Sequence, residues 1–208
     1  MSLLPEPTAF IVDDDPSVLK ALKRLLDAAG IPAATFHSAH AFLEAYDPDA
    51  LGCLVLDVRM PDMGGFELQD RLTESGCTLP IVFLTGHGDI SMSVMAMKHG
   101  AADFLTKPVS SEQLLAAIRE GFMKCRLAHD GRSARRSIEE RLRTLTHRER
   151  EVLEHLIGGK LNKQVAADLG TVEKTIKVHR SRIMEKMGVR SMAELVRLCE
   201  TVGLKPAP

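Results

Sequence analysis

The sequence lacks the cysteine spacing that marks a zinc site or a disulfide framework. Its 208 residues include four cysteines, and no two of them stand close together in the chain. Structural zinc sites and disulfide-rich scaffolds both show paired or regularly spaced cysteines. We therefore expect reduced thiols at all four positions, which are Cys53, Cys77, Cys125 and Cys199.

A long hydrophobic run is missing as well. No stretch approaches the roughly eighteen consecutive apolar residues that suggest a membrane span. No N-terminal segment joins basic residues to a long apolar one, as a secretion signal would. We expect a cytoplasmic protein that does not bind membranes.

The net charge of the chain is close to zero, but this value hides an uneven distribution of charge along the sequence. The formal net charge of the chain is −1. Residues 1–120 carry 8 Lys and Arg against 17 Asp and Glu, a net charge of −9, whereas residues 121–208 carry 19 against 11, a net charge of +8. An acidic half suits a cation and a basic half suits a polyanion. Because the chain is long and 45% hydrophobic, we predict two domains, each with its own core.

Two predicted strands end on carboxylates. Residues 10–12 lead into Asp13 and Asp14, and residues 54–56 lead into Asp57. Continuous apolar strands are typical of parallel sheets, which bind ligands at the carboxyl ends of their strands. Like charges about 4 Å apart repel by roughly 4 kcal/mol at an effective dielectric near 20, so converging carboxylates favour a bound cation. A site with few ligands, all of them oxygen, suits Mg²⁺.

Two more predicted strands end on side chains that complement a phosphate. Residues 80–84 lead to Thr85, and residues 102–105 lead towards Lys107. A threonine hydroxyl can donate a hydrogen bond to a phosphoryl oxygen and a lysine can neutralise it, as phosphoryl transfer requires. Taken singly, Asp57 is more typical of a turn than of a phosphorylation site, Thr85 is typical of a strand end, and Lys107 is typical of a solvated charge at a loop.

Strands and helices alternate through the first half of the sequence. This order predicts an α/β fold with a five-stranded parallel sheet and helices on both of its faces. Asp15 followed by a proline predicts the start of the first helix. The predicted strands are 8–12, 32–36, 51–56, 80–84 and 102–105, and the predicted helices are 16–29, 38–46, 64–75, 89–99 and 110–123.

Residues 7–122 resemble the receiver domain of two-component response regulators. The resemblance implies a flavodoxin-like fold with strand order 2-1-3-4-5, and a phosphoryl group that Asp57 accepts from a sensor histidine kinase. It implies Mg²⁺ held by Asp13, Asp14, Asp57 and the main-chain carbonyl of Arg59. The matching motifs are Val12-Asp13-Asp14, Asp57 with Met60-Pro61-Asp62 and Gly64-Gly65, Thr85-Gly86-His87-Gly88, and Lys107-Pro108.

The same resemblance implies a switch. Phe104 would turn inward with Thr85 on activation, and the Lys107–Pro108 bond would be cis. The family most often dimerises through the face formed by the fourth helix, fifth strand and fifth helix. In this sequence that face comprises residues 89–98, 102–105 and 110–119.

Residues 123–144 are polar and rich in arginine, and we interpret them as a partly helical linker to a second domain at 145–204. Ile138, Leu142 and Leu145 keep helical spacing, so the later part can extend a helix into that domain. The arginines are typical of a solvated helix face, with contact to DNA phosphates as the alternative.

The second domain is predicted to be all helical. Thr146 and Glu149 have the spacing of a capping box, and Asn162 and Thr171 can cap two later helices. In the last of these helices one side is apolar and is predicted to be core, namely Val172, Ile176, Ile183 and Met187. The other side carries Lys174, Lys177, Val178, Ser181 and Arg182, a face that can enter a DNA major groove.

Residues 142–200 resemble the helix-turn-helix of LuxR-type regulators, which together with the receiver makes the chain similar to response regulators of the FixJ/NarL type. The resemblance rests on Thr146 with Arg148-Glu149 and Glu151-Val152-Leu153, Asn162-Lys163-Gln164-Val165-Ala166, Thr175-Ile176-Lys177-Val178-His179 and Met187-Gly188-Val189-Arg190-Ser191. It implies base reading by Lys177, Val178 and Ser181, with Lys174, Thr175 and Arg182 in the same face. Ser181 departs from the cation that some relatives place there.

The expected function is a phosphorylation-controlled transcription regulator with a sensor kinase, double-stranded DNA, a second copy and RNA polymerase as partners. It is not expected to be an enzyme beyond its own phosphotransfer and autodephosphorylation. Two alternatives stay open. One is a magnesium-dependent phosphohydrolase, and the other is a DNA-binding protein whose receiver dimerises without phosphate.

Overall fold

The computed structural model describes residues 6–86 and 90–207. Its residue contacts divide into two compact units, Met1–His129 and Asp130–Pro208. The strands are β1 Thr8–Val12, β2 Ala33–Phe36, β3 Gly52–Asp57, β4 Ile81–Thr85 and β5 Asp103–Thr106. The helices are α1 Pro16–Ala28, α2 Ala39–Ala45, α3 Gly65–Glu74, α4 Ile90–Lys98, α5 Ser111–Arg143, α6 His147–Ile157, α7 Asn162–Asp168, α8 Glu173–Met187 and α9 Met192–Thr201.

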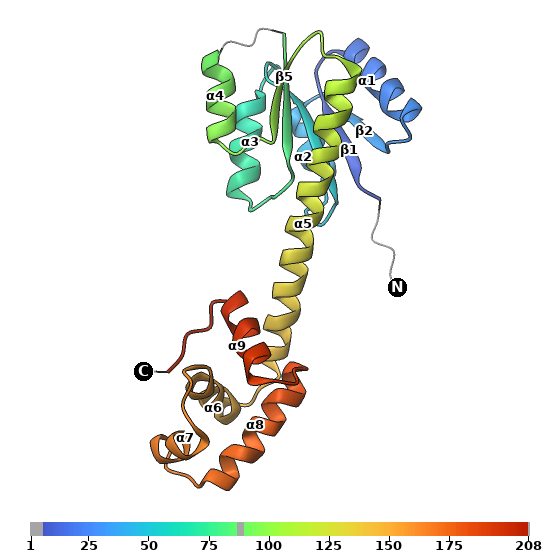
Figure 1. The fold of residues 1–208 in the computed structure, drawn as a ribbon. Coiled ribbons are helices and arrows are strands. Elements are labelled where there is room, and N and C mark those ends of the chain that lie inside the picture. Colours follow the sequence, from blue (N-terminus) through green and yellow to red (C-terminus); the bar gives the residue numbers. More distant parts are fainter. Residues whose placement is uncertain (1–5, 87–89, 208) are drawn as a thin grey trace. The chain divides into compact units, whose positions relative to one another are not determined.

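The five strands form one parallel sheet in the order β2-β1-β3-β4-β5 (Figure 1). The predicted fold and strand order are therefore confirmed. β1 lies between β2 and β3, and β4 lies between β3 and β5, so the four strands that carry candidate site residues are consecutive neighbours. In a parallel sheet all their carboxyl ends meet at one edge.

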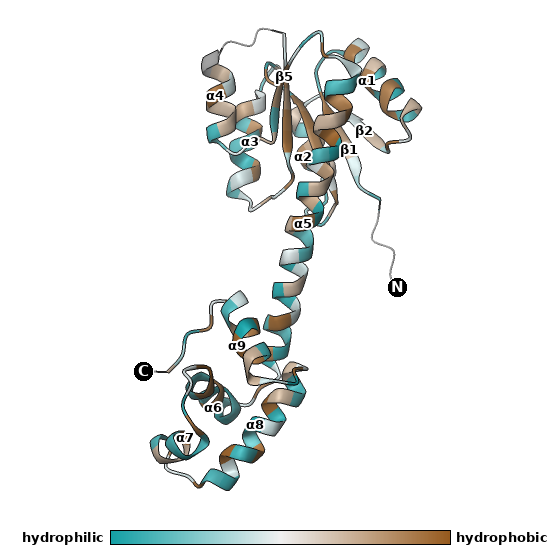
Figure 2. Cartoon of the chain, viewed as in Figure 1, coloured by the Kyte–Doolittle hydropathy of each residue, from teal (hydrophilic) through white to brown (hydrophobic). Residues whose placement is uncertain are grey.

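Side chains that alternate along the strands fill two separate cores. Leu22 and Leu26 of α1, with Leu114 and Ile118 of α5, pack on one face of the sheet. Helices α2, α3 and α4 pack on the other face, around the fully buried Phe83 of β4. Figure 2 shows hydrophobic residues concentrated on the central strands, and a mixture of hydrophobic and hydrophilic residues on the helices around them. Each fully buried Leu or Phe contributes about 1.5–3 kcal/mol, so the edge of the sheet that bears the site is firmly held.

Two of the four predicted helix caps are present in the structure. Asp15 accepts a hydrogen bond from Ser17 N at 2.8 Å and caps α1, and the capping box of Thr146 and Glu149 is formed at α6. The predicted caps Asn162 and Thr171 are wrong by one position. Leu161 and Val172 precede α7 and α8 instead, and neither supplies a side-chain cap.

Val172 also corrects the predicted core of α8. Ile176, Ile183 and Met187 are fully buried as predicted, but Val172 is 63% exposed. Val172 is the residue before the first helical turn, and its backbone is extended. The helical repeat therefore does not determine the direction of the Val172 side chain.

Helix α5 runs without a break from Ser111 to Arg143. The segment expected to be only partly helical, 123–144, is helical as far as Arg143. Ion pairs at spacing i,i+4 join Glu120 to Lys124 and Glu139 to Arg135. Each exposed pair of this kind supports a helix by about 0.2–0.5 kcal/mol, which suits a segment with little apolar content.

The described residues of the C-terminal unit, 130–207, contain helices and no strand. Their core gathers one face of each helix around Leu153, Ile176 and Leu195. Among the described helices of the whole chain, none is long and apolar enough to cross a membrane.

Candidate functional site

The sheet brings Asp13 and Asp57 to the same edge. β1 and β3 pair in parallel with Val12 beside Leu56, so the residue after each pair is an aspartate and the two leave the sheet side by side. Thr85 ends β4 next to them, and β5 pairs with β4 so that Lys107 follows directly after Thr106. The convergence that the strand ends predicted is therefore present in the structure.

A single ammonium joins the two carboxylates. Lys107 Nζ lies 2.6 Å from Asp13 Oδ2 and 2.5 Å from Asp57 Oδ1. The side chains of Asp13 and Asp57 are 2% and 9% exposed, whereas that of Lys107 is 26% exposed. One cation, itself partly exposed, thus offsets the repulsion between two nearly buried anions.

The remaining oxygens of these carboxylates are held by the backbone. Asp15 N donates to Asp13 Oδ1 at 3.0 Å, and Arg59 N donates to Asp57 Oδ2 at 2.7 Å. Lys107 N donates to the carbonyl of Thr85 at 2.7 Å. The site is therefore preorganised, because each side chain is fixed by groups on neighbouring strands or loops.

Burial and pairing shift the pKa values in this site. Burial raises the pKa of Asp13 above its usual range, and the hydrogen bonds from Lys107 and from Asp15 N only partly offset this. Burial alone would lower the pKa of Lys107, but its hydrogen bonds with the two carboxylates outweigh burial and raise the pKa. Lys107 therefore remains an ammonium at neutral pH, and Asp13 favours a further positive charge nearby.

Gly65 lets α3 begin directly against the end of β3. A Cβ added at Gly65 would lie 2.4 Å from the carbonyl oxygen of Asp57, closer than any side chain can come. Gly65 N also donates to the carbonyl of Val58 at 3.0 Å. The Gly64-Gly65 motif was noted from the sequence, but this packing role was not visible without the fold.

The other predicted receiver residues differ in burial. Thr85 is fully buried, and Asp14 and Arg59 are exposed. Phe104 is half-buried, with its ring 6.3 Å from that of Phe83. The Lys107–Pro108 bond is cis, as predicted. His87, Gly88 and Asp89, which the motifs and the dimer face included, lie outside the described residues.

Two of the three predicted metal-binding carboxylates lie together. Among the described residues, no group of three or more Asp, Glu, His or Cys side chains is arranged to hold a metal ion. The donor chemistry of the centre nevertheless fits Mg²⁺, since Asp13 and Asp57 offer only oxygen and already share one cation. Asp14 and the Arg59 carbonyl stay predictions as metal ligands.

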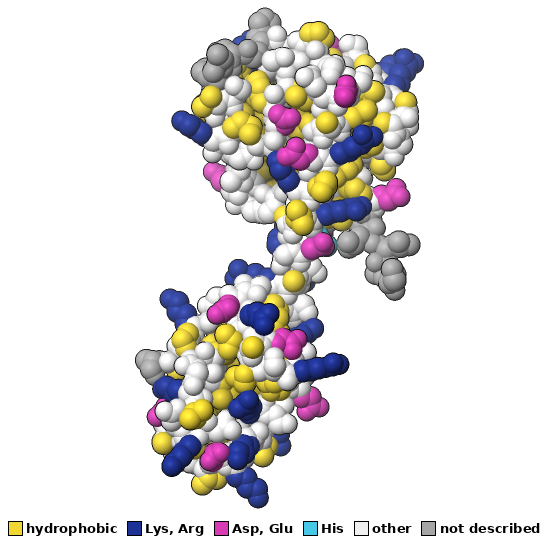
Figure 3. Space-filling view, in the orientation of Figure 1, with side chains coloured by type: hydrophobic (Ala, Val, Ile, Leu, Met, Phe, Trp, Pro, Cys, Tyr) yellow, Lys and Arg dark blue, Asp and Glu magenta, His cyan; other side chains and the backbone are white. Residues whose placement is uncertain are grey.

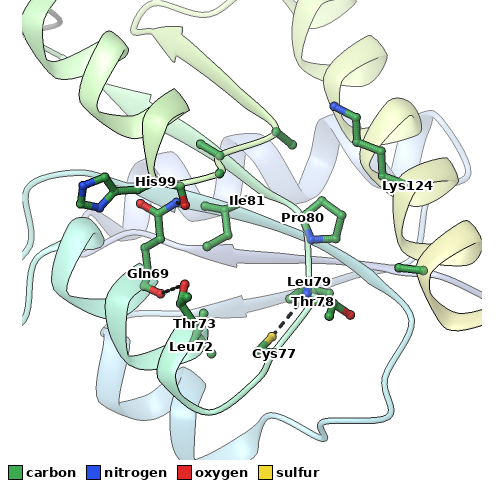
Figure 4. Close-up of a pocket in the computed structure, with 14 residues that line it drawn as sticks. Gln69, Leu72, Thr73, Cys77, Thr78, Leu79, Pro80, Ile81, His99 and Lys124 are labelled. Atoms are coloured by element: carbon green, nitrogen blue, oxygen red, sulfur yellow. Dashed lines mark hydrogen bonds between the residues drawn. The ribbon is translucent and has the colours of Figure 1, made fainter. Parts of the chain in front are cut away.

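A separate pocket of about 300 Å³ opens near the other end of β4 (Figure 4). Pro80, His99 and Lys124 help to line it. Thr85 ends β4 four residues beyond Ile81, or about 13 Å at the usual rise per residue, so the pocket does not adjoin the carboxylates. Gln69 Nε2 donates to the carbonyl of His99 at 3.1 Å across its wall. The pocket therefore lies among α3, the start of β4, the segment between α4 and β5, and α5, and is separate from the site.

The C-terminal unit presents the predicted DNA-reading face on α8. Lys174, Lys177, Val178, Ser181 and Arg182 are exposed, while Thr175 is half-buried. Lys177 pairs with Glu173 at 3.2 Å, and both side chains stay largely exposed. In Figure 3 the visible face of this unit carries more Lys and Arg than Asp and Glu side chains. A positive, exposed helix face is the electrostatic footprint that DNA phosphates require.

A buried ion pair holds α8 against the start of α6. Glu149 is 2% exposed, and its Oε2 accepts from Lys186 Nζ at 2.7 Å and from Thr146 N at 2.9 Å. Burial would raise the pKa of Glu149, but these hydrogen bonds outweigh it and hold the pKa below its usual range. The capping box was predicted from spacing, whereas the partner Lys186, 37 residues away, was not.

Comparison with known families shows what kind of protein combines the carboxylate centre with the basic face of α8. The sequence profile of the response regulator receiver domain matches residues 9–119. The profile of the luxR family of bacterial regulatory proteins matches residues 143–199. The chain belongs to the two-component response regulators that carry a LuxR-type DNA-binding domain.

Full-length relatives support the assignment. The chain is 44% identical to the response regulator protein TodT of Pseudomonas putida over 92% of its own length and 84% of that protein. It is 42% identical to the transcriptional regulatory protein FixJ of Azorhizobium caulinodans, over 95% of its own length and 93% of that protein. The solved structure of the response regulator StyR is 49% identical and covers 94% of this chain and 98% of that one, with a TM-score of 0.85. This response regulator is thus a transcription regulator of the FixJ type.

Proposed function

We propose that this response regulator accepts a phosphoryl group on Asp57 from a sensor histidine kinase, and that the phosphate controls dimerisation and sequence-specific DNA binding. The observation that carries the proposal is the ion pair of Lys107 with Asp57 and Asp13 at the edge of the sheet. A nucleophilic carboxylate held beside a fixed cation is what transfer of a phosphoryl group needs.

The proposed transfer is a substitution at phosphorus. One carboxylate oxygen of Asp57 forms a bond to phosphorus while the bond from phosphorus to the histidine nitrogen of the kinase breaks, and the released imidazole takes up a proton. Lys107 neutralises a phosphoryl oxygen, and the hydroxyl of Thr85 donates to another. Asp13 and Asp57 would hold Mg²⁺, which when bound offsets the charge on the phosphoryl oxygens.

The proposed switch begins with the charge at Asp57. A phosphoryl group draws the Lys107 ammonium and the Thr85 hydroxyl towards new oxygens, and Phe104 then moves into the space beside Thr85. The dimer face at α4, β5 and α5 is supported by exposed apolar side chains on α4. These are Val94, Met95 and Met97, which are 46%, 45% and 51% exposed.

In the proposed output, α8 enters the major groove. Lys177 and Ser181 read base edges, Val178 meets a thymine methyl group, and Lys174 and Arg182 contact phosphates. A dimer would bind two half-sites related by its twofold axis. A cytoplasmic location and contact with RNA polymerase complete the proposal.

The direct experiment treats the purified chain with a small phosphodonor and Mg²⁺ and then locates the label by peptide mapping. We expect label on Asp57 and none in Asp57→Asn. Asp62→Asn is the matched control, because Asp62 is an exposed acid in the same loop. Label that persists in Asp57→Asn, or that disappears in Asp62→Asn alone, would contradict the assignment.

A further inference from the structure

Helix α8, which we propose enters the DNA major groove, is attached at its C-terminal end to the last turn of α5. Arg141 Nη1 of α5 donates to the carbonyl of Met187 at 2.9 Å. In the opposite direction, Lys186 Nζ of α8 donates to the carbonyl of Thr144 at 3.0 Å, just after α5 ends. Two hydrogen bonds from charged groups therefore cross between these helix ends.

The Met187 carbonyl, which accepts the hydrogen bond from Arg141, lies at a helix end where few other donors are at hand. The last four carbonyls of a helix lack partners within the helix, and a cation is favourable there because of the helix dipole. Gly188 ends α8 in the left-handed region, with φ of 65°. A Cβ added at Gly188 would lie 3.1 Å from Arg141 Nη1, so glycine also leaves room for the guanidinium.

Apolar packing supports the same junction. Ile138 and Leu142, one turn apart on α5, are each 5% exposed and share a core with Ile183 and Met187 of α8. The luxR profile begins only at residue 143. The end of α5 therefore completes the core of the DNA-binding unit, although it lies outside the residues that the profile matches.

We propose that Arg141 is a positioning residue for DNA reading, which sets the location of α8 relative to the rest of its unit. The inference rests on the proposed DNA binding by α8. A helix is stiff over the ten residues that separate Lys177 from Met187, so a shift at its C-terminal end moves the base-reading side chains. Arg141 and Met187 both belong to the C-terminal unit, so this contact lies within one unit.

The test compares Arg141→Ala, Arg141→Lys and Arg143→Ala in the 208-residue chain. Arg141 and Arg143 are both exposed and two residues apart, so the two alanine variants lose the same charge from the same helix end. Two probes are used. One is a duplex that the wild-type chain selects from a random-sequence pool, and the other is a shuffled duplex of the same composition. The readouts are the ratio of the two affinities and the midpoint of thermal unfolding.

We expect Arg141→Ala to lower the ratio of selected to shuffled affinity by about 3- to 10-fold, which corresponds to about 0.7–1.4 kcal/mol and lies within the net contribution of an ordinary hydrogen bond. Arg143→Ala should weaken both affinities together and leave the ratio unchanged, because it removes only charge. Arg141→Lys should restore part of the ratio. All three variants should remain folded, and Arg141→Ala should unfold at a somewhat lower temperature than Arg143→Ala because it loses an internal hydrogen bond.

Three results separate the possible failures. An equal ratio in Arg141→Ala and Arg143→Ala would overturn the inference. A loss of stability in Arg141→Ala with no change in the ratio would assign Arg141 a structural role and overturn it as well. A wild-type chain that selects no sequence at all would instead overturn the proposed DNA binding.

Discussion

The acidic site of the receiver domain and the proposed DNA-reading face of α8 use charge in opposite ways. At the first, Lys107 is shared by two nearly buried carboxylates whose other oxygens accept hydrogen bonds from the backbone. On the second, Lys174 and Arg182 are exposed to solvent. A fixed, partly desolvated centre suits bond formation, whereas an exposed cationic face suits a long-range attraction that salt screens.

This difference predicts different responses to substitution. In the receiver site, removal of one charge leaves others uncompensated, so stability and metal binding should change together. On the exposed face of α8, removal of one charge should change affinity for DNA and leave stability nearly untouched. Lys107→Met and Lys174→Ala test this contrast directly, and two further variants test the buried Glu149 and the start of α8.

Lys107→Met should have the largest effect on stability. Removing one partner from a buried ion pair typically costs about 3–5 kcal/mol, and we expect about 3 kcal/mol here because Lys107 is partly exposed. Mg²⁺ should recover much of the loss, since a cation that binds only the folded chain stabilises it. Urea unfolding with Mg²⁺ and with a chelator measures both effects. Lys20→Met, which removes an exposed cation from α1, should be near neutral. A Lys107→Met chain as stable as wild type in chelator would contradict the shared ion pair.

Glu149→Gln should destabilise the C-terminal unit by about 1.5–3 kcal/mol at neutral pH, because it removes a hydrogen-bonded charge from a buried pair. The folded-state pKa of Glu149 lies below its ordinary value of 4.5. Its contribution is therefore present above pH 4.5 and is lost as pH falls through the lower, folded-state value. Urea unfolding as a function of pH should show the gap between variant and wild type closing in acid. A difference in stability of the same size at every pH would show that the charge of Glu149 is irrelevant. Glu200→Gln, at an exposed position, is the control.

Lys174→Ala should reduce DNA affinity without changing stability. Loss of one phosphate contact lowers the slope of log affinity against log salt by about 1. Titrations of a duplex at several salt concentrations measure the slope, and thermal unfolding measures stability. Lys205→Ala removes an exposed cation near the C-terminus, outside α8, and should leave the slope unchanged. Equal changes in the two variants would show that α8 makes no special contact with DNA.

Val172→Thr should have the smallest effect and the opposite sign. Val172 precedes α8 without a side-chain cap, and a threonine there can accept a hydrogen bond from the first turn. A cap of this kind contributes about 0.5–1 kcal/mol. Chemical denaturation should show a gain of that size, and Val172→Ala should show none. A gain in both variants would point to the loss of an exposed valine rather than to a cap.

The receiver site was largely predictable because its geometry follows from strand order. Runs of apolar residues gave the strands, a parallel sheet gathers their carboxyl ends, and Asp13, Asp57 and Lys107 therefore had to meet. The direct placement of Lys107 between the two carboxylates was not predicted. Spacing along the chain indicates which strand ends are close, but not which side chain reaches which oxygen.

In the C-terminal unit, features set by local spacing were predictable, whereas contacts between distant helices were not. The capping box and most of the core of α8 follow from local spacing, and the structure confirms them. Val172 was assigned to the core because helical phase was extended beyond the helix. The contacts of Lys186 with Glu149 and of Arg141 with Met187 join residues 37 and 46 positions apart. No periodic pattern carries that information, since it depends on how the helices pack.

The central claim is that phosphate on Asp57 controls DNA binding, and one titration tests it most directly. The affinity of the wild-type chain and of Asp57→Asn for a selected duplex is measured at fixed salt and Mg²⁺, with and without a small phosphodonor. We predict that the phosphodonor increases the affinity of the wild-type chain and leaves that of Asp57→Asn unchanged. An equal response in the two chains, or none in the wild type despite label on Asp57, would contradict the account.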